Sequence, residues 1–162
     1  MNKKTMDLCI SGISIAIYVV VLYFTQSISF GQYQIRLATS MYSMVYIFEF
    51  LCIPLGIANM LSNLCFGALG LLDMIGGFVV GIVTTRLICI MRKIHRNPMF
   101  CCLPIAVIPT IVVPIWLHYI LGIEYIVLVI HMIPGQIVAS IIGGTIIIPA
   151  IQWINKTIIT ND

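Results

Sequence analysis

Long apolar segments, separated by short polar or proline-containing stretches, occupy almost the whole chain. Continuous apolar runs of this kind are typical of membrane-spanning helices, which need about 20 residues to cross roughly 30 Å of hydrocarbon. Strands of an outer-membrane barrel would instead alternate between apolar and polar positions. The pattern predicts an all-α integral membrane protein, in which one domain (residues 1–162) forms a bundle of six transmembrane helices with short loops. The predicted spans cover about residues 5–25, 37–53, 55–69, 71–91, 98–121 and 124–155.

Proline marks two places where these helices are expected to change. We expect the second span to stop at Pro54, because proline cannot donate a backbone hydrogen bond within a helix. The last segment is too long for one straight span. We therefore expect it to tilt, to kink near Pro134 and Gly135, and to protrude from the bilayer at one end.

Composition supports a membrane protein and excludes several soluble classes. Of the 162 residues, 61% are hydrophobic and 8% are charged, whereas soluble domains have about 45–50% apolar and about 25% charged residues. This excludes a cytosolic enzyme, a disordered chain, a fibrous repeat and a nucleic-acid-binding domain. The six cysteines lack metal-ligand spacing and are expected to be packing residues. No catalytic motif occurs, so neither an enzyme nor a metal or cofactor is predicted.

Basic residues give the expected orientation. With a cytoplasmic N-terminus and six spans, most of the eight Lys and Arg residues lie inside, where the positive-inside rule favours them. They are Lys3, Lys4, Arg92, Lys93, Arg96 and Lys156. Arg86 lies close enough to the inner end of its span to reach the interface. Both termini are therefore predicted to be cytoplasmic.

Polar side chains inside the apolar segments are candidates for a binding site, because each is costly in lipid unless it has a partner or a function. The candidates are Gln34, Arg36 and Asp73 at the outer face, and Asn63, His131 and Gln136 deeper in the membrane. They are expected to converge on one outward-open pocket, where Phe30 and Tyr33 would stack on a planar ligand. Two alternatives stay open: hydrogen bonds between helices for the deeper residues, and solvation at the interface for Arg36 and Asp73.

Two further patterns concern contacts between helices. Glu49 lies in an apolar stretch of the second predicted span and is expected to pair with Arg86 on the fourth. Small residues spaced four apart let another helix approach closely. Such pairs are Gly12 and Ala16, Gly77 and Gly81, and Ala139 and Gly143. Each pair fits either packing within the bundle or docking of a partner helix.

Several short motifs occur in an order that resembles one known family. They are Ile17-Tyr-Val-Val, Ile28-Ser-Phe-Gly31, Gln34-Ile-Arg36, Ser62-Asn-Leu64 and Gly70-Leu-Leu-Asp-Met-Ile-Gly76, with Gly135-Gln136 in the last segment. Their order and spacing are similar to those of the QueT family of queuosine-precursor transporters. Members of that family are substrate-binding (S) components of energy-coupling-factor (ECF) transporters. The resemblance is clearest over residues 16–81.

The resemblance implies a fold, partners and a ligand. An S component has six helices, cytoplasmic termini and an outward-opening pocket. It works with a transmembrane coupling (T) component and two cytoplasmic ATPases in the cell membrane of a prokaryote. Gly12 and Ala16 match the small-residue stripe of the first helix that contacts the coupling component. The implied ligand is a micronutrient such as queuine or another queuosine precursor, which is a planar heterocycle.

The chain departs from the family pattern at two places. Ala38-Thr39 stands where a Ser-Glu pair is usual, and Gln136 stands where glutamate is usual. Carboxylates readily accept hydrogen bonds from the N–H groups of a 7-deazaguanine, so their loss leaves the identity of the ligand open. The residues alone also leave a stand-alone secondary transporter or channel as an alternative, although no inverted repeat is detectable.

Overall fold

The structure is a computed structural model that describes residues 2–30, 35–67 and 69–160, and these residues form helices with no strand among them. Among these described residues, five stretches are long and apolar enough to cross a membrane. They are Lys3–Phe24, Glu49–Gly67, Leu71–Ile94, Pro98–Leu121 and Tyr125–Lys156. The predicted all-helical membrane bundle is confirmed, but five such stretches stand where six spans were expected.

Shorter helices interrupt or join several of these stretches. In chain order the elements are α1 (Lys3–Phe24), α2 (Gln26–Ser29), η1 (Leu37–Tyr46), η2 (Glu49–Leu51), α3 (Cys52–Ser62), η3 (Asn63–Gly67), α4 (Leu71–Ile94), α5 (Pro98–Cys101), α6 (Leu103–Leu121), α7 (Tyr125–Ile142), η4 (Gly143–Ile147) and α8 (Ile148–Thr160). Elements η1 and η2 are 3-10 helices, which have three residues per turn. Elements η3 and η4 are single π-helical turns.

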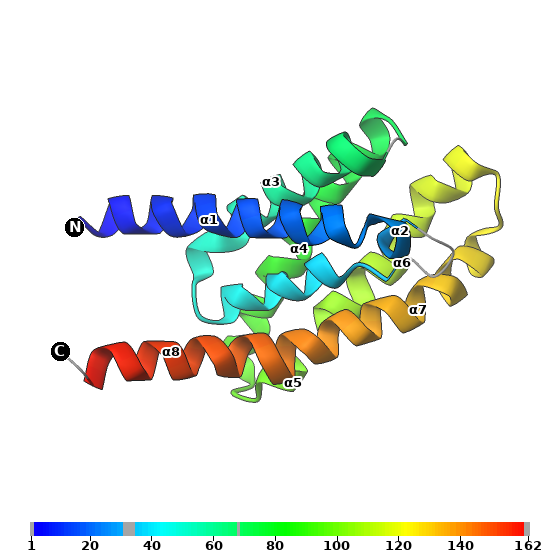
Figure 1. Cartoon of the computed structure of the whole chain (residues 1–162). Coiled ribbons are helices and arrows are strands. Elements are labelled where there is room, and N and C mark those ends of the chain that lie inside the picture. Colours follow the sequence, from blue (N-terminus) through cyan, green and yellow to red (C-terminus); the bar gives the residue numbers. More distant parts are fainter. Residues whose placement is uncertain (1, 31–34, 68, 161–162) are drawn as a thin grey trace.

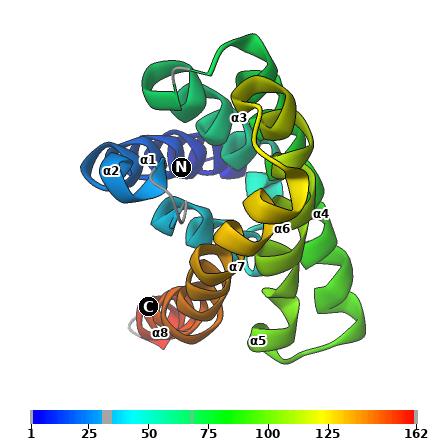
Figure 2. The ribbon, with the colours of Figure 1, turned by 90° about the vertical axis from the view of Figure 1, so that its right-hand side faces the viewer.

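The long helices surround η1. Figure 1 shows η1 (cyan) between α1 and the long rod formed by α7 and α8, and η1 also packs against α4 and η4. Figure 2, turned by 90°, shows α4 and α6 together on the side away from α1. Helix α1 begins and α8 ends at the same end of the molecule (Figure 1). This arrangement places Thr39 and Ser40, the polar residues near the start of η1, inside the bundle.

The second predicted span, over residues 37–53, is wrong in both type and extent. Element η1 rises about 2.0 Å per residue, so its ten residues extend about 20 Å, short of the roughly 30 Å of hydrocarbon. Most of its residues are buried. Side-chain hydrogen bonds add to the backbone hydrogen bonds of its first turns. The Thr39 hydroxyl donates to the Arg36 carbonyl and the Ser40 hydroxyl donates to the Leu37 carbonyl, both at 2.6 Å.

The break between the second and third predicted spans lies earlier than expected. Helix α3 begins at Cys52, and Pro54 lies in its first turn. Proline is tolerated there because the N–H that it lacks would have no partner within the helix. The chain leaves helical geometry instead at Phe48 (φ −116°, ψ 82°), just before η2.

The last predicted segment forms one continuous rod, α7–η4–α8 (Figure 1). Pro134 lies inside α7, and the departure from α-helical hydrogen bonding falls at Gly143–Ile147 instead. A Cβ on Gly143 would lie 3.1 Å from the Ser40 carbonyl oxygen, and one on Gly144 would lie 3.1 Å from Met99 Sδ. The irregular turn is therefore accompanied by close packing against η1 and α5 and lies just before Pro149, not at Pro134.

The three pairs of small residues divide between the interior and the exterior. On α4, a Cβ on Gly81 would lie 3.0 Å from Gly56 Cα, so α3 approaches α4 closely there. Ala139, near the end of α7, and Gly143, the first residue of η4, are also buried. Gly12 and Ala16 are exposed on α1, and a Cβ on Gly12 would meet no described atom within 4 Å. Packing within the bundle is confirmed for two pairs and is wrong for the α1 pair.

Candidate functional site

A cluster of buried polar side chains lies where η1 meets α3 and α4. Arg36, directly before η1, is only 7% exposed. Its Nη2 donates to Asn59 Oδ1 at 2.9 Å and to Asn63 Oδ1 at 2.7 Å. The guanidinium carbon lies 5.4 Å from the centre of the Phe30 ring. Two amide oxygens and one aromatic ring therefore stabilise a cation that is largely shielded from water.

Helix α4 fixes the orientation of the two asparagines. Asn59 Nδ2 donates to the Gly77 carbonyl at 2.7 Å, and Asn63 Nδ2 donates to the Asp73 carbonyl at 2.9 Å. Because the amide nitrogens are bound to α4, the amide oxygens face the guanidinium. Gly77 makes this contact possible, since a Cβ there would lie 2.6 Å from Asn63 Nδ2.

Asp73 belongs to the contact between α4 and α6. It is 4% exposed, and its Oδ1 accepts a hydrogen bond from Trp116 Nε1 at 3.0 Å. Its Oδ2 is buried and has no hydrogen-bond partner among the described residues. Both charged residues that were expected at the outer face are therefore buried. Solvation at the membrane interface is wrong for Arg36 and for Asp73.

A small cavity lies between η1, α3, α4, α6 and α7. Its volume is about 10 Å³, roughly the space of one water molecule. Its polar lining comprises Arg36, Thr39, Tyr42, Asn59, Asn63 and Gln136, and its apolar lining includes Val80, Pro109, Val113, Trp116 and Met132. A planar heterocycle exceeds this volume, so binding there requires the surrounding helices to move apart.

Gln136 closes the cavity from α7. It is fully buried, its Oε1 lies 3.5 Å from Thr39 Oγ1, and its Nε2 has no partner among the described residues. The single proton of the Thr39 hydroxyl is already used in the 2.6 Å bond to the Arg36 carbonyl. Buried polar groups are normally hydrogen-bonded. The Gln136 amide therefore has hydrogen-bonding capacity beside the cavity that the described residues leave unused.

The 3-10 geometry of η1 brings its polar residues to this cavity. Arg36, Thr39 and Tyr42 follow one another at intervals of three, and all of them line it. Three residues per turn place such positions in one column, whereas an α-helix would rotate each by about 60° from the one before. Tyr42 in turn stacks on Tyr18 of α1, with ring centres 5.9 Å apart and hydroxyl oxygens 3.4 Å apart.

The structure brings four of the predicted site residues together. They are Arg36, Asn63, Asp73 and Gln136. Phe30 packs on the guanidinium and does not line the cavity. His131 is partly exposed on α7, outside the cavity lining, with its Nδ1 2.7 Å from the Val127 carbonyl oxygen. Gln34 and Tyr33 lie outside the described residues.

The sequence patterns did not single out three important members of the cluster. Asn59 lies one helical turn before Asn63, and this spacing was a usable signal because both amides then face the same neighbour. Trp116 was hidden in a strongly apolar segment, although its indole N–H needs an acceptor when buried. No pattern in the sequence pointed to Tyr42, because its position at the cavity depends on the 3-10 helix.

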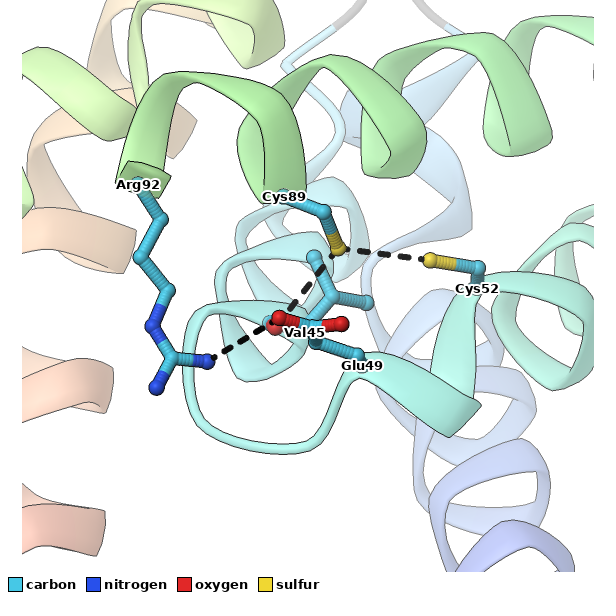
Figure 3. A network of polar contacts seen from close by, with 5 residues as sticks. All are labelled: Val45, Glu49, Cys52, Cys89 and Arg92. Atoms are coloured by element: carbon cyan, nitrogen blue, oxygen red, sulfur yellow. Dashed lines mark hydrogen bonds and ion pairs between the residues drawn. The ribbon is translucent and has the colours of Figure 1, made fainter. Parts of the chain in front are cut away.

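A second polar network joins η1 and η2 to the end of α4 (Figure 3). Glu49 Oε1 lies 3.5 Å from Arg92 Nη1, and both side chains are partly exposed. The expected partner, Arg86, is exposed on α4 and forms no ion pair with Glu49 in the part of the chain that the structure describes. The prediction failed because Glu49 lies in η2, level with the last turns of α4, rather than within a long second helix. Nearby, the Sγ atoms of Cys52 and Cys89 lie 3.6 Å apart.

Long apolar helices that enclose a buried cluster of a guanidinium and amides are typical of a multi-pass membrane protein. The chain belongs to the QueT transporter family, whose family model matches residues 8–153, nearly the whole chain. The resemblance inferred from the sequence motifs is thereby confirmed, and the protein is a membrane transporter. No curated protein and no solved structure matches the chain.

Proposed function

We propose that this chain is the S component of an ECF-type uptake transporter and captures a queuosine precursor at the outer face of a prokaryotic cell membrane. Membership of the QueT family supports transport. The buried cluster of Arg36, Asn59, Asn63 and Gln136 is the observation that carries the binding role. Energy would come from partners, namely a transmembrane coupling (T) component and two cytoplasmic ATPases.

The chemistry of the cavity supports a planar heterocycle as the ligand. Amide side chains offer hydrogen-bond donors and acceptors to the edge of a base. Tyr42 and Trp116 supply aromatic rings, and Pro109 and Met132 supply apolar walls. Ligand sites commonly combine mostly apolar walls with a few placed polar groups.

Binding and transport measured on the same purified chain test this proposal. The isolated protein should bind a queuosine precursor in calorimetry, and native mass spectrometry should detect a co-purified small molecule. In proteoliposomes it should move no ligand until the coupling component and ATPases are added. Accumulation of ligand by the chain alone would contradict the S-component role and favour a stand-alone transporter.

We assign the docking of the coupling component to the exposed face of α1. Gly12 and Ala16 lie there beside Ile13 and Ile17, which are 59% and 47% exposed. Small residues four apart leave a smooth surface on which another membrane helix can pack closely. No described side chain of this chain covers Gly12.

Bulky substitutions test this assignment. Replacing Gly12 and Ala16 together with leucine should reduce uptake by the assembled transporter and leave ligand binding by the isolated chain near normal. Val79→Leu, on an exposed face of α4, is the matched control and should leave uptake unchanged. Joint loss of binding and uptake in the double variant would contradict a docking role.

We also propose that both termini are cytoplasmic. The start of α1 and the end of α8 lie at the same end of the molecule (Figure 1). Lys3 and Lys4 begin α1, and Arg92 and Lys93 lie in the last turn of α4; the positive-inside rule favours such residues on the cytoplasmic side. Reporter fusions at the two chain ends should both read cytoplasmic, and an external reading at either end would contradict this orientation.

A further inference from the structure

We propose that the cavity selects queuosine precursors that carry no positive charge and excludes those that bear an ammonium group, with Arg36 and Gln136 as the residues that set this preference. The inference rests on the proposed function, because it concerns the ligand of the same cavity. It follows from the distribution of charge around the cavity and from the polar atoms that have no partner there.

The first observation is that no carboxylate forms a direct ion pair with Arg36 among the described residues. Its guanidinium is buried and contacts two neutral amide oxygens. The described residues place no carboxylate oxygen within 4.0 Å of its nitrogens. Its Nε is buried and has no hydrogen-bond acceptor among them. The cavity therefore contains a positive charge and an unused donor.

The second observation is that Asp73, the acidic residue of the cluster, is directed elsewhere. Its Oδ1 is hydrogen-bonded to Trp116 Nε1 at 3.0 Å. Its Oδ2 lies against η3, only 2.9 Å from the position that a Cβ on Gly67 would take. Asp73 is not among the residues that line the cavity. Its carboxylate is therefore not placed to receive an ammonium group from a ligand inside.

The third observation is that the wall opposite η1 is neutral. Gln136 is fully buried, and its Nε2 has no partner among the described residues. Arg36 is the only charged side chain among the residues that line the cavity. Rotating the Gln136 amide would exchange its oxygen and nitrogen but would add no charge. The selection therefore depends on charge and not on which way this amide points.

A positively charged ligand would meet a like charge in a region where water does not screen it. Like charges brought together in a buried site cost several kcal/mol in general, and a buried charge without a partner is strongly unfavourable. A neutral substituent with an acceptor atom would instead accept hydrogen bonds from Arg36 Nε or Gln136 Nε2. The preferred ligand is a planar heterocycle whose substituent is an uncharged acceptor. Queuine itself, whose secondary amine is protonated at neutral pH, is therefore among the precursors that this cavity disfavours.

Two precursors that differ in one substituent test the inference. The compound 7-cyano-7-deazaguanine is neutral, and 7-aminomethyl-7-deazaguanine has the same ring with an ammonium group at neutral pH. Calorimetry on the whole chain in detergent or nanodiscs should give at least about tenfold tighter binding of the cyano compound, a ratio that corresponds to about 1.4 kcal/mol. Unsubstituted 7-deazaguanine reports the contribution of the ring alone.

Two variants at one position separate charge from polarity. Gln136→Glu introduces a carboxylate of nearly the same size and should shift the ratio of affinities toward the aminomethyl compound by at least about tenfold. Gln136→Met removes the amide without adding charge. It should weaken binding of the cyano compound, but the cyano compound should still bind more tightly than the aminomethyl compound. Size-exclusion profiles and melting temperatures establish that each variant is folded.

The possible results distinguish failure of the charge selection from failure of the proposed function. Equal or tighter binding of the aminomethyl compound by the wild-type chain would overturn the charge selection and leave the proposed function standing. Failure to bind any of the three compounds would contradict the proposed function, and the selection with it. If Gln136→Glu does not fold, the ratio measured on the wild-type chain still decides.

Discussion

Replacing Gly77 with alanine tests the contact on which the polar cluster depends. The added Cβ would lie 2.6 Å from Asn63 Nδ2 and 3.3 Å from Asn63 Cγ. Asn63 would have to give up its hydrogen bonds to Arg36 and to the Asp73 carbonyl. Two buried hydrogen bonds, one of them to a charged group, are worth about 2.5–4 kcal/mol together, and the better helix propensity of alanine returns about 1 kcal/mol. We expect a net loss of about 1.5–3 kcal/mol in the free energy of unfolding.

Thermal unfolding in detergent measures this loss. For a chain of this size, the melting temperature of Gly77→Ala should fall by on the order of 5–10 °C. Gly12→Ala is the matched control, because a Cβ at Gly12 meets nothing within 4 Å; its melting temperature should be unchanged or slightly higher. Equal melting temperatures for the two variants would refute the close approach of α3 to α4.

Three further predictions concern individual side-chain contacts of α3, η3, α4 and α6. Asn63→Ala should weaken binding of the best ligand by roughly 5- to 150-fold in calorimetry, since it removes one buried hydrogen-bonding partner. Trp116→Phe leaves the carboxylate of Asp73 without its indole donor, and chemical unfolding should show a loss of about 1–3 kcal/mol. Mild oxidation with diamide should join Cys52 to Cys89, which peptide mass spectrometry detects and which a serine at either position abolishes; absence of the linked peptide would contradict the packing of α3 on α4.

Polarity within apolar segments identified the centre of the candidate site. Arg36, Asn63, Asp73 and Gln136 were recognisable because a polar side chain inside a bundle of apolar helices must have a partner or a ligand. Their depth was harder to predict, since Arg36 was expected at the outer mouth and lies within the bundle. Its burial depends on the amide oxygens of Asn59 in α3 and Asn63 in η3, which come from a different part of the chain and leave no local pattern.

The fold was predictable where a helix has a long apolar run and a clear end. Helices α1, α4 and α6 fall close to their predicted spans, because apolar length decides whether a segment can cross a bilayer. Element η1 was not predictable as a 3-10 helix, because an apolar run of that length fits either helix type. Pro54 was misleading because the same residue is tolerated in the first turn of a helix as readily as after its end.

The 3-10 geometry of η1 also has a consequence for insertions and deletions. Adding or removing one residue between Arg36 and Tyr42 would turn the rest of η1 by about 120°, and Tyr42 would leave the column that faces the cavity. A change of three residues would keep the column and shift it along the axis by one turn, about 6 Å. In a series of insertions, binding should therefore be least affected at multiples of three residues, whereas a cavity wall built from an α-helix would give a period of about 3.6 residues.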